Sequence, residues 1–120
     1  MAFRDLPASA LRVNGHDPDV RVYRATSFLA RGIGLLLGPQ LSTTEALWIS
    51  PCNSVHTFGM RYGIDVVFLD ASLRVIAHRE ALRPGRWAAC RRAASVLELP
   101  ACAARRAGLE RDAMIRLEDL

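Results

Sequence analysis

Hydrophobic and polar residues alternate over short stretches along much of the chain, a pattern typical of half-buried β-strands. Residues 11–14 and 20–23 alternate in this way, and the segment NGHDPD between them is rich in turn-forming residues, so a β-hairpin is predicted. The run IDVVFL at 64–69 is apolar except for Asp65, which indicates a strand buried on both faces. Residues 73–80 alternate again and are predicted to return as the second strand of another hairpin.

Shorter apolar runs predict three more strands, at residues 46–49, 95–99 and 113–117. The segment LRPGRW separates two of these regions and contains Pro84 followed by Gly85. This pair suits the two central positions of a type II turn, because proline fixes the first φ and glycine accepts the positive second φ.

Helical spacing appears in two places. The segment ATSFLARGIGLLLG at residues 25–38 predicts a short helix, although its glycines weaken it. A second short helix is predicted over residues 101–107, opened by Pro100 and ended by Gly108.

These elements predict an α+β fold that is rich in β-structure. We expect a curled or barrel-like antiparallel or mixed sheet of about seven short strands with two short helices. The length of 120 residues fits a single domain, spanning residues 1–120, with one core. No glycine-rich phosphate loop of either familiar type is present in the sequence.

The charge pattern narrows the range of partners. The net charge is +4, all sixteen basic residues are arginine, and no lysine occurs. The arginines are scattered and no aromatic residue interleaves a basic run, which argues against a nucleic-acid partner. No apolar stretch is long enough to span a membrane, and the first residues lack a secretory pattern, so we expect a cytoplasmic protein. The three cysteines, at 52, 90 and 102, are then expected as reduced thiols.

The densest candidate chemistry lies in the polar loop PCNSVHTFGM at residues 51–60, between two apolar runs. Cys52 and His56 have the spacing C-x3-H of half a zinc site, but no second ligand pair accompanies them. We therefore expect no metal and no cofactor. A second hypothesis is an enzyme in which Cys52 is the nucleophile, His56 the base and Asp65 the group that orients the base.

The alternative to chemistry is that the loop has a structural role. Ser54 and Thr57 are residues that cap backbone amides, Cys52 behaves as a small buried hydrophobic residue, and Met60 fills gaps in a core. Asp65 would then accept hydrogen bonds from the amides of the loop and anchor it. If residues 56–60 are extended, His56, Phe58 and Met60 share one face while Thr57 lies on the other.

The turn at residues 83–87 adds a possible binding surface. Trp87 could cover one end of a barrel-like sheet, and Arg86 could bind an anion through its planar guanidinium. The favoured hypothesis is therefore a module that binds a small ligand, including an anionic one, or a protein partner, with loop 51–60 and turn 83–87 around one site.

The order of these motifs resembles the domain of unknown function 192 family of small bacterial and archaeal proteins. The resemblance covers about residues 10–118 and is carried by PCNSVHTFGMRYGIDVVFLD, LRPGRW, VLELPA and a terminal GLxxxD. It implies a single-domain, β-rich α+β fold with a barrel-like sheet, and it implies no established activity.

Three residues depart from the family pattern. Gly63 stands where proline is common, Cys102 stands where a glycine usually follows VLELPA, and Arg111 stands where the closing turn often has glycine. If the position of Cys102 requires a positive φ, the loss of glycine strains the turn there.

Overall fold

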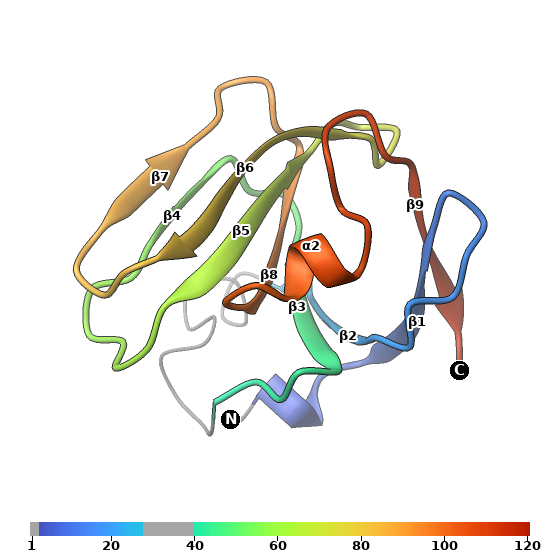
Figure 1. The fold of residues 1–120 in the computed structure, drawn as a ribbon, viewed down its shortest axis with the longest axis horizontal. Coiled ribbons are helices and arrows are strands. Elements are labelled where there is room, and N and C mark those ends of the chain that lie inside the picture. The colour runs from blue at the N-terminus through green and yellow to red at the C-terminus, as the bar shows by residue number, and fades with distance from the viewer. Residues whose placement is uncertain (1–2, 28–39) are drawn as a thin grey trace.

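The computed structural model describes residues 3–27 and 40–120, which contain nine strands, one 3-10 helix and one short α-helix (Figure 1). The elements are η1 (Phe3–Asp5), β1 (Ala8–Val13), β2 (Arg21–Ala25), β3 (Glu45–Ile49), β4 (Ser54–His56), β5 (Ile64–Leu69), β6 (Val75–Leu82), β7 (Trp87–Ala89), β8 (Ser95–Pro100), α2 (Ala103–Arg106) and β9 (Ile115–Asp119).

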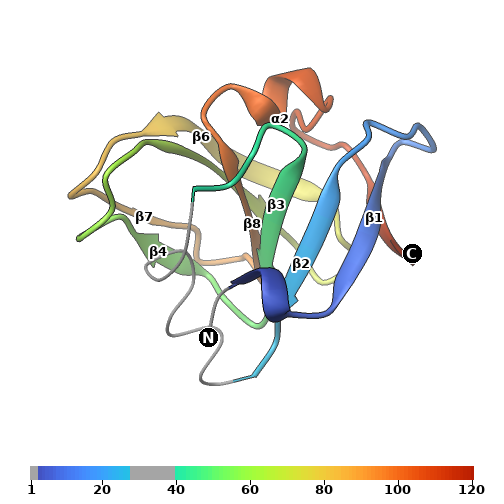
Figure 2. The same ribbon diagram turned by 90° about the horizontal axis from the view of Figure 1, so that it is seen from below.

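Seven strands form one mixed sheet in the order β6-β5-β8-β3-β2-β1-β9. Only β2 and β3 run parallel, and the other neighbours are antiparallel. Both predicted hairpins are confirmed, as β1–β2 and β5–β6. Viewed from below, β3, β2 and β1 lie side by side along one flank of the curled sheet (Figure 2).

The sheet curls so that residues from both of its ends share one core. Leu11 of β1, Ile115 of β9, Val67 of β5 and Leu97 of β8 belong to a single buried cluster on the inner face, and Ala103 of α2 joins it at one end. The outer face carries a second cluster. All six residues of β5 and all six of β8 are buried, which explains why β5 is apolar except for Asp65 and does not alternate.

The curl stops short of a closed barrel. The edge strands β6 and β9 meet only where they begin, through the isolated bridge between Arg74 and Met114. Two backbone hydrogen bonds accompany it, from Ile115 N to Leu73 O at 3.0 Å and from Val75 N to Ala113 O at 2.9 Å. Beyond this point the two strands diverge, so the predicted barrel-like shape is correct only as a strong curl.

The α+β prediction is corrected to a mostly β fold, since the described residues contain a single α-helix of four residues. The helix predicted at 25–38 falls almost entirely outside the described residues. The second predicted helix exists but begins later, because Pro100 ends β8 instead of opening α2. No helix in the described ranges has the length and apolar character required to cross a membrane.

The end of α2 forms as predicted. Gly108 has a φ of +77°, and the amides of Gly108 and Leu109 bond to the carbonyls of Arg105 and Ala104 at 3.1 and 2.9 Å. This pair of bonds is the Schellman motif, in which the residue after the helix adopts a left-handed conformation that suits glycine.

Candidate functional site

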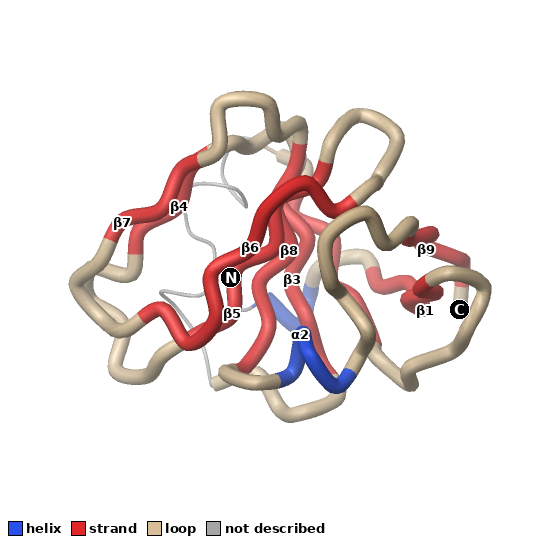
Figure 3. Tube along the Cα trace, turned by 45° about the horizontal axis from the view of Figure 1, so that its top comes forward, coloured by secondary structure: helices blue, strands red, loops and turns tan. Residues whose placement is uncertain are grey.

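The loop at 51–60 and the turn at 83–87 come together in the structure. Strand β4 lies inside the predicted loop and pairs antiparallel with β7, so that His56 stands opposite Trp87 and Val55 opposite Ala88. We call this two-stranded sheet the ribbon. Figure 3 shows the ribbon at one flank of the molecule, far from β1 and β9. Both strands are only three residues long, which is why neither was predicted.

Thr57 fastens the turn to the ribbon. Its side chain is fully buried, and its hydroxyl donates to Arg83 O at 2.6 Å while accepting from Arg86 N at 2.8 Å. The Thr57 amide also donates to Arg86 O at 2.9 Å. Gly85 has a φ of +74°, as a type II turn requires of its third residue. Thr57 therefore has the structural role in the polar loop that capping residues usually have.

Asp65 does not anchor the polar loop, so that prediction is wrong. Its carboxylate is 1% exposed and accepts hydrogen bonds from Ala81 N of β6 at 2.8 Å and from Ala104 N of α2 at 3.0 Å. The first residues of α2 need such an acceptor because Cys102, at the N-cap position, makes no side-chain hydrogen bond to the helix. Asp65 thus ties α2 and β6 to β5.

Cys102 occupies a strained position. Its φ is +72°, in the left-handed region where a side chain is disfavoured. The concern raised by the missing glycine at this position is therefore justified.

The other candidates in the loop have different surroundings. The Cys52 thiol donates to Ser54 O at 3.1 Å and packs at the margin of the outer core, as does Met60. His56 is exposed and stacks on Phe58, with ring centroids 5.3 Å apart and planes at 24°. The shared face predicted for His56 and Phe58 is thus seen, whereas Met60 turns inward. Among the described residues, no group of three or more His, Cys, Asp and Glu is placed to hold a metal ion.

Three aromatic side chains define the most accessible part of this region. Phe58 is 52% exposed, Trp87 is 62% exposed, and His56 lies between them by its stacking on Phe58 and its pairing with Trp87. We call these three residues, together with the exposed Arg86, the ribbon surface. Phe58 was not selected from the sequence as a site residue, although its alternation with His56 was the signal that could have identified it.

A buried acid lies on the outer face of the main sheet. Glu98 of β8 is 5% exposed and stands between Leu47 of β3 and Val66 of β5, and this burial raises its pKa to about 7. The pKa of Tyr62 is raised mainly by burial and to a smaller extent by the nearby charge of Glu98. The Tyr62 hydroxyl is buried, and the backbone of Leu41 acts in the opposite direction on its pKa.

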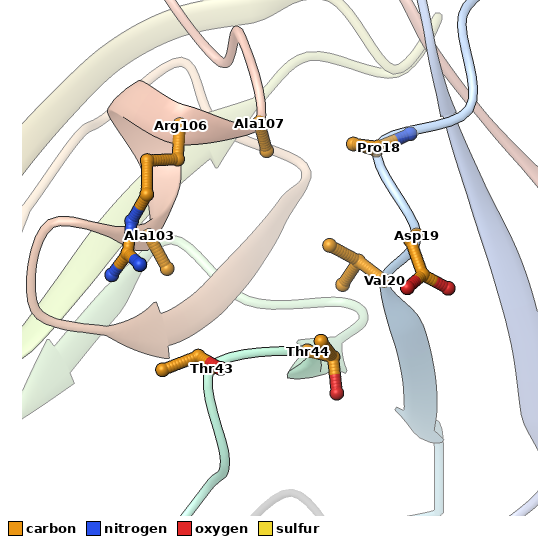
Figure 4. Close-up of a pocket in the computed structure, with 8 residues that line it drawn as sticks. All are labelled: Pro18, Asp19, Val20, Thr43, Thr44, Ala103, Arg106 and Ala107. Carbon is orange, nitrogen blue, oxygen red and sulfur yellow. The ribbon is translucent and has the colours of Figure 1, made fainter.

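A small cavity that the sequence did not indicate lies beside α2 (Figure 4). Its volume is about 180 Å³. It is lined by Pro18, Asp19, Val20, Thr43, Thr44, Ala103, Arg106 and Ala107. These residues come from the segments before β2 and β3 and from α2, which are far apart in sequence, so no motif links them.

Among the described residues, three polar groups that line this cavity have no protein partner, namely the Arg106 guanidinium, the Thr43 hydroxyl and the Asp19 carboxylate. Figure 4 shows Arg106 reaching down from α2 toward Thr43, while the Asp19 carboxylate lies on the far wall. Within residues 3–27 and 40–120, neither Arg106 nor the Thr43 hydroxyl forms a hydrogen bond or ion pair. The neighbouring Arg105 differs, since it pairs with Glu80 at 2.9 Å.

Comparison with known proteins identifies the family. The model of the family DUF192, described as "Uncharacterized ACR", matches residues 9–117. The chain therefore belongs to this family, as the resemblance in its sequence indicated. No curated protein matches it.

Two crystal structures have the same fold. One is a "putative transcription regulator" from Sinorhizobium meliloti, with a TM-score of 0.82 and 18% identity over 93% of this chain and 95% of that one. The other is a protein of unknown function from Novosphingobium aromaticivorans, with a TM-score of 0.77 and 17% identity over 92% of this chain and 86% of that one. At these identities the likeness extends to the fold alone.

Proposed function

We propose that this protein is a protein-binding module and that its contact surface is the ribbon surface. The observation that carries the proposal is the exposure of Phe58 and Trp87 beside His56 on one short ribbon. Large aromatic side chains are normally buried, and clusters of them on a surface mark contact sites. Tryptophan and arginine are also the residues that most often dominate binding energy at protein interfaces.

Burial of these two side chains would supply part of the free energy of a specific contact. Complete burial of a large apolar side chain contributes about 2 kcal/mol, so the remaining exposed area of Phe58 and Trp87 together offers about 2–3 kcal/mol. The ribbon holds these side chains in place before a partner arrives, because Thr57 fixes the turn that precedes Trp87. Such preorganisation lowers the entropic cost of binding.

The shape of the region favours a protein surface over an enclosed small ligand. Within the part of the chain that the structure describes, a cavity beside the ribbon is lined by Pro51, Cys52, Asn53, Ala93 and Ala94, and its lining does not include the aromatic residues. The aromatic rings instead project from the ribbon.

Site-specific photo-crosslinking in the native host tests this proposal. The amino acid p-benzoylphenylalanine placed at position 87 should give a discrete adduct with another protein, and the substitution Phe58→Ala should suppress that adduct. The matched control is position 114, where Met114 is also apolar and 39% exposed but lies immediately before β9. The absence of a protein adduct at 87, or an equal adduct at 114, would refute the proposal.

A second candidate function is the binding of a small anion in the cavity of Figure 4. It is favoured by the Arg106 guanidinium and the Thr43 hydroxyl there, since an arginine and a hydroxyl suit a carboxylate or a phosphate. Phosphate and acetate should each be tested for an increase in melting temperature. The increase should persist in Arg105→Gln and disappear in Arg106→Gln, and an increase that survives in Arg106→Gln would refute this assignment.

A further inference from the structure

We infer that the partner of the ribbon surface is an acidic, extended segment of another protein, which adds as a strand to the outer edge of β7. This inference rests on the proposed function and specifies the chemistry of the partner.

The charge of the ribbon region is one-sided. Residues 51–63 and 83–94 contain five of the sixteen arginines and none of the twelve acidic residues. The other eleven arginines and the twelve acidic residues almost cancel, so these two segments account for the net charge of +4. The two segments are separated by β5 and β6 in the chain, and the pairing of β4 with β7 brings their arginines to one region of the structure.

The five arginines are available to a partner. All are exposed, and none belongs to the ion pairs found within the described ranges. They are Arg61, Arg83, Arg86, Arg91 and Arg92. A carboxylate-bearing partner could pair with several of them, and each such contact can be bidentate.

The edge of β7 supplies a second, independent feature. Among the strands of residues 3–27 and 40–120, β7 is hydrogen-bonded to β4 alone, and it lies at the outer margin of the ribbon (Figure 1). The bonds from Thr57 N to Arg86 O and from Cys90 N to Asn53 O direct the backbone groups of Arg86 and Cys90 toward β4. Since these groups alternate along a strand, those of Trp87 and Ala89 point outward.

An open strand edge favours a polypeptide over a nucleic acid. Trp87 and Ala89 are both exposed, so their backbone groups can pair with an incoming strand, which is the recognition mode called β-augmentation. The side chain of Trp87 would then contact alternate residues of that strand, while the arginines at either end of the ribbon would meet its carboxylates. Single-stranded nucleic acid would use the same arginines and aromatic rings but not the backbone edge.

Fluorescence anisotropy with three labelled probes tests the inference. The probes are a peptide that alternates glutamate with valine, the same peptide with glutamine in place of glutamate, and oligothymidylate. We expect the glutamate peptide to bind roughly tenfold more tightly than the glutamine peptide, with an affinity that falls as salt is added. Amide exchange at Trp87 and Ala89 should slow when the glutamate peptide is bound.

Variants locate the binding. The triple substitution Arg61→Gln, Arg83→Gln and Arg86→Gln should abolish the preference for glutamate, whereas Arg111→Gln, an exposed arginine outside the ribbon, should retain it. Tighter binding of oligothymidylate than of the glutamate peptide would overturn the inference, as would unchanged exchange at Trp87 and Ala89.

The two proposals can fail separately. If crosslinking at position 87 captures a protein while the glutamate and glutamine peptides bind equally, the acidic partner is refuted and the protein-binding function remains. If position 87 captures no protein and neither peptide binds, both are refuted.

Discussion

Replacement of Asp65 should destabilise the protein strongly, because its buried carboxylate accepts two backbone hydrogen bonds. The loss should exceed that caused by replacing an exposed carboxylate that accepts the same number of bonds. The Asp65 carboxylate is almost fully buried and bonds to Ala81 N and Ala104 N at 2.8 and 3.0 Å. Hydrogen bonds to a charged group are worth about 1.5–3 kcal/mol each, and two buried amides would lose their acceptor. Relief of the cost of burying the carboxylate offsets part of this, so we expect Asp65→Ala to lower the free energy of unfolding by about 3–4 kcal/mol.

Asp70 provides the matched control. Its carboxylate also accepts from two backbone amides, those of Ser72 and Arg74, both at 2.9 Å, but it does so in an exposed turn. Asp70→Ala should therefore cost about 1 kcal/mol. Urea unfolding followed by tryptophan fluorescence measures both values, and Asp65→Asn, which keeps one acceptor oxygen, gives an intermediate loss if Asp65→Ala does not fold. Equal losses for Asp65→Ala and Asp70→Ala would refute the reasoning.

Three further predictions concern individual contacts. Thr57→Val should lower the free energy of unfolding by about 1–3 kcal/mol, because it removes the buried hydroxyl from the turn; a loss in thermal melts no larger than that of Ser54→Ala would contradict this. The raised pKa of Glu98 means that the folded protein holds this proton up to about pH 7 while the unfolded chain releases it near 4.5, so stability should fall by about 3 kcal/mol as pH rises between these values. Urea unfolding across this range should show that slope in the wild type and a flatter one in Glu98→Gln, and identical slopes would exclude the assignment. Gly108→Ala should cost about 1 kcal/mol in the same assay because of its positive φ, and a neutral effect would show that the helix end tolerates a side chain.

The main sheet could be predicted from the sequence because its strands have apolar runs or alternations long enough to be recognised. Strand β5 was predicted with its observed bounds, since a run of six residues that is apolar at every position except Asp65 has few other structures available. Strands β4 and β7 were missed because three residues are too short for any alternation to be recognised. Their pairing depends on Thr57, which contacts a turn 26 residues later in the chain.

The sequence predicted where the candidate site lies, but it did not predict the hydrogen-bond partners of the residues around it. The residues of loop 51–60 and turn 83–87 do adjoin, yet Asp65 bonds to amides 16 and 39 residues away instead of to the loop. Hydrogen-bond partners at that separation depend on the curl of the sheet, which no local pattern encodes. The two segments that carry the aromatic residues and the arginines are separated by β5 and β6 in the chain, and this separation likewise concealed how they gather on the ribbon.

The indole nitrogen signals of the two tryptophans give the most direct test of the ribbon surface. A nitrogen-15 NMR spectrum contains one indole N–H signal from each tryptophan. Trp87 lies on the ribbon surface, whereas the Trp48 indole N–H is buried, so its signal serves as an internal control. Addition of the glutamate–valine peptide, or of the protein captured by crosslinking, should shift the Trp87 signal and leave that of Trp48 unchanged. A bound partner that leaves the Trp87 signal unmoved, or shifts that of Trp48 instead, would contradict the account.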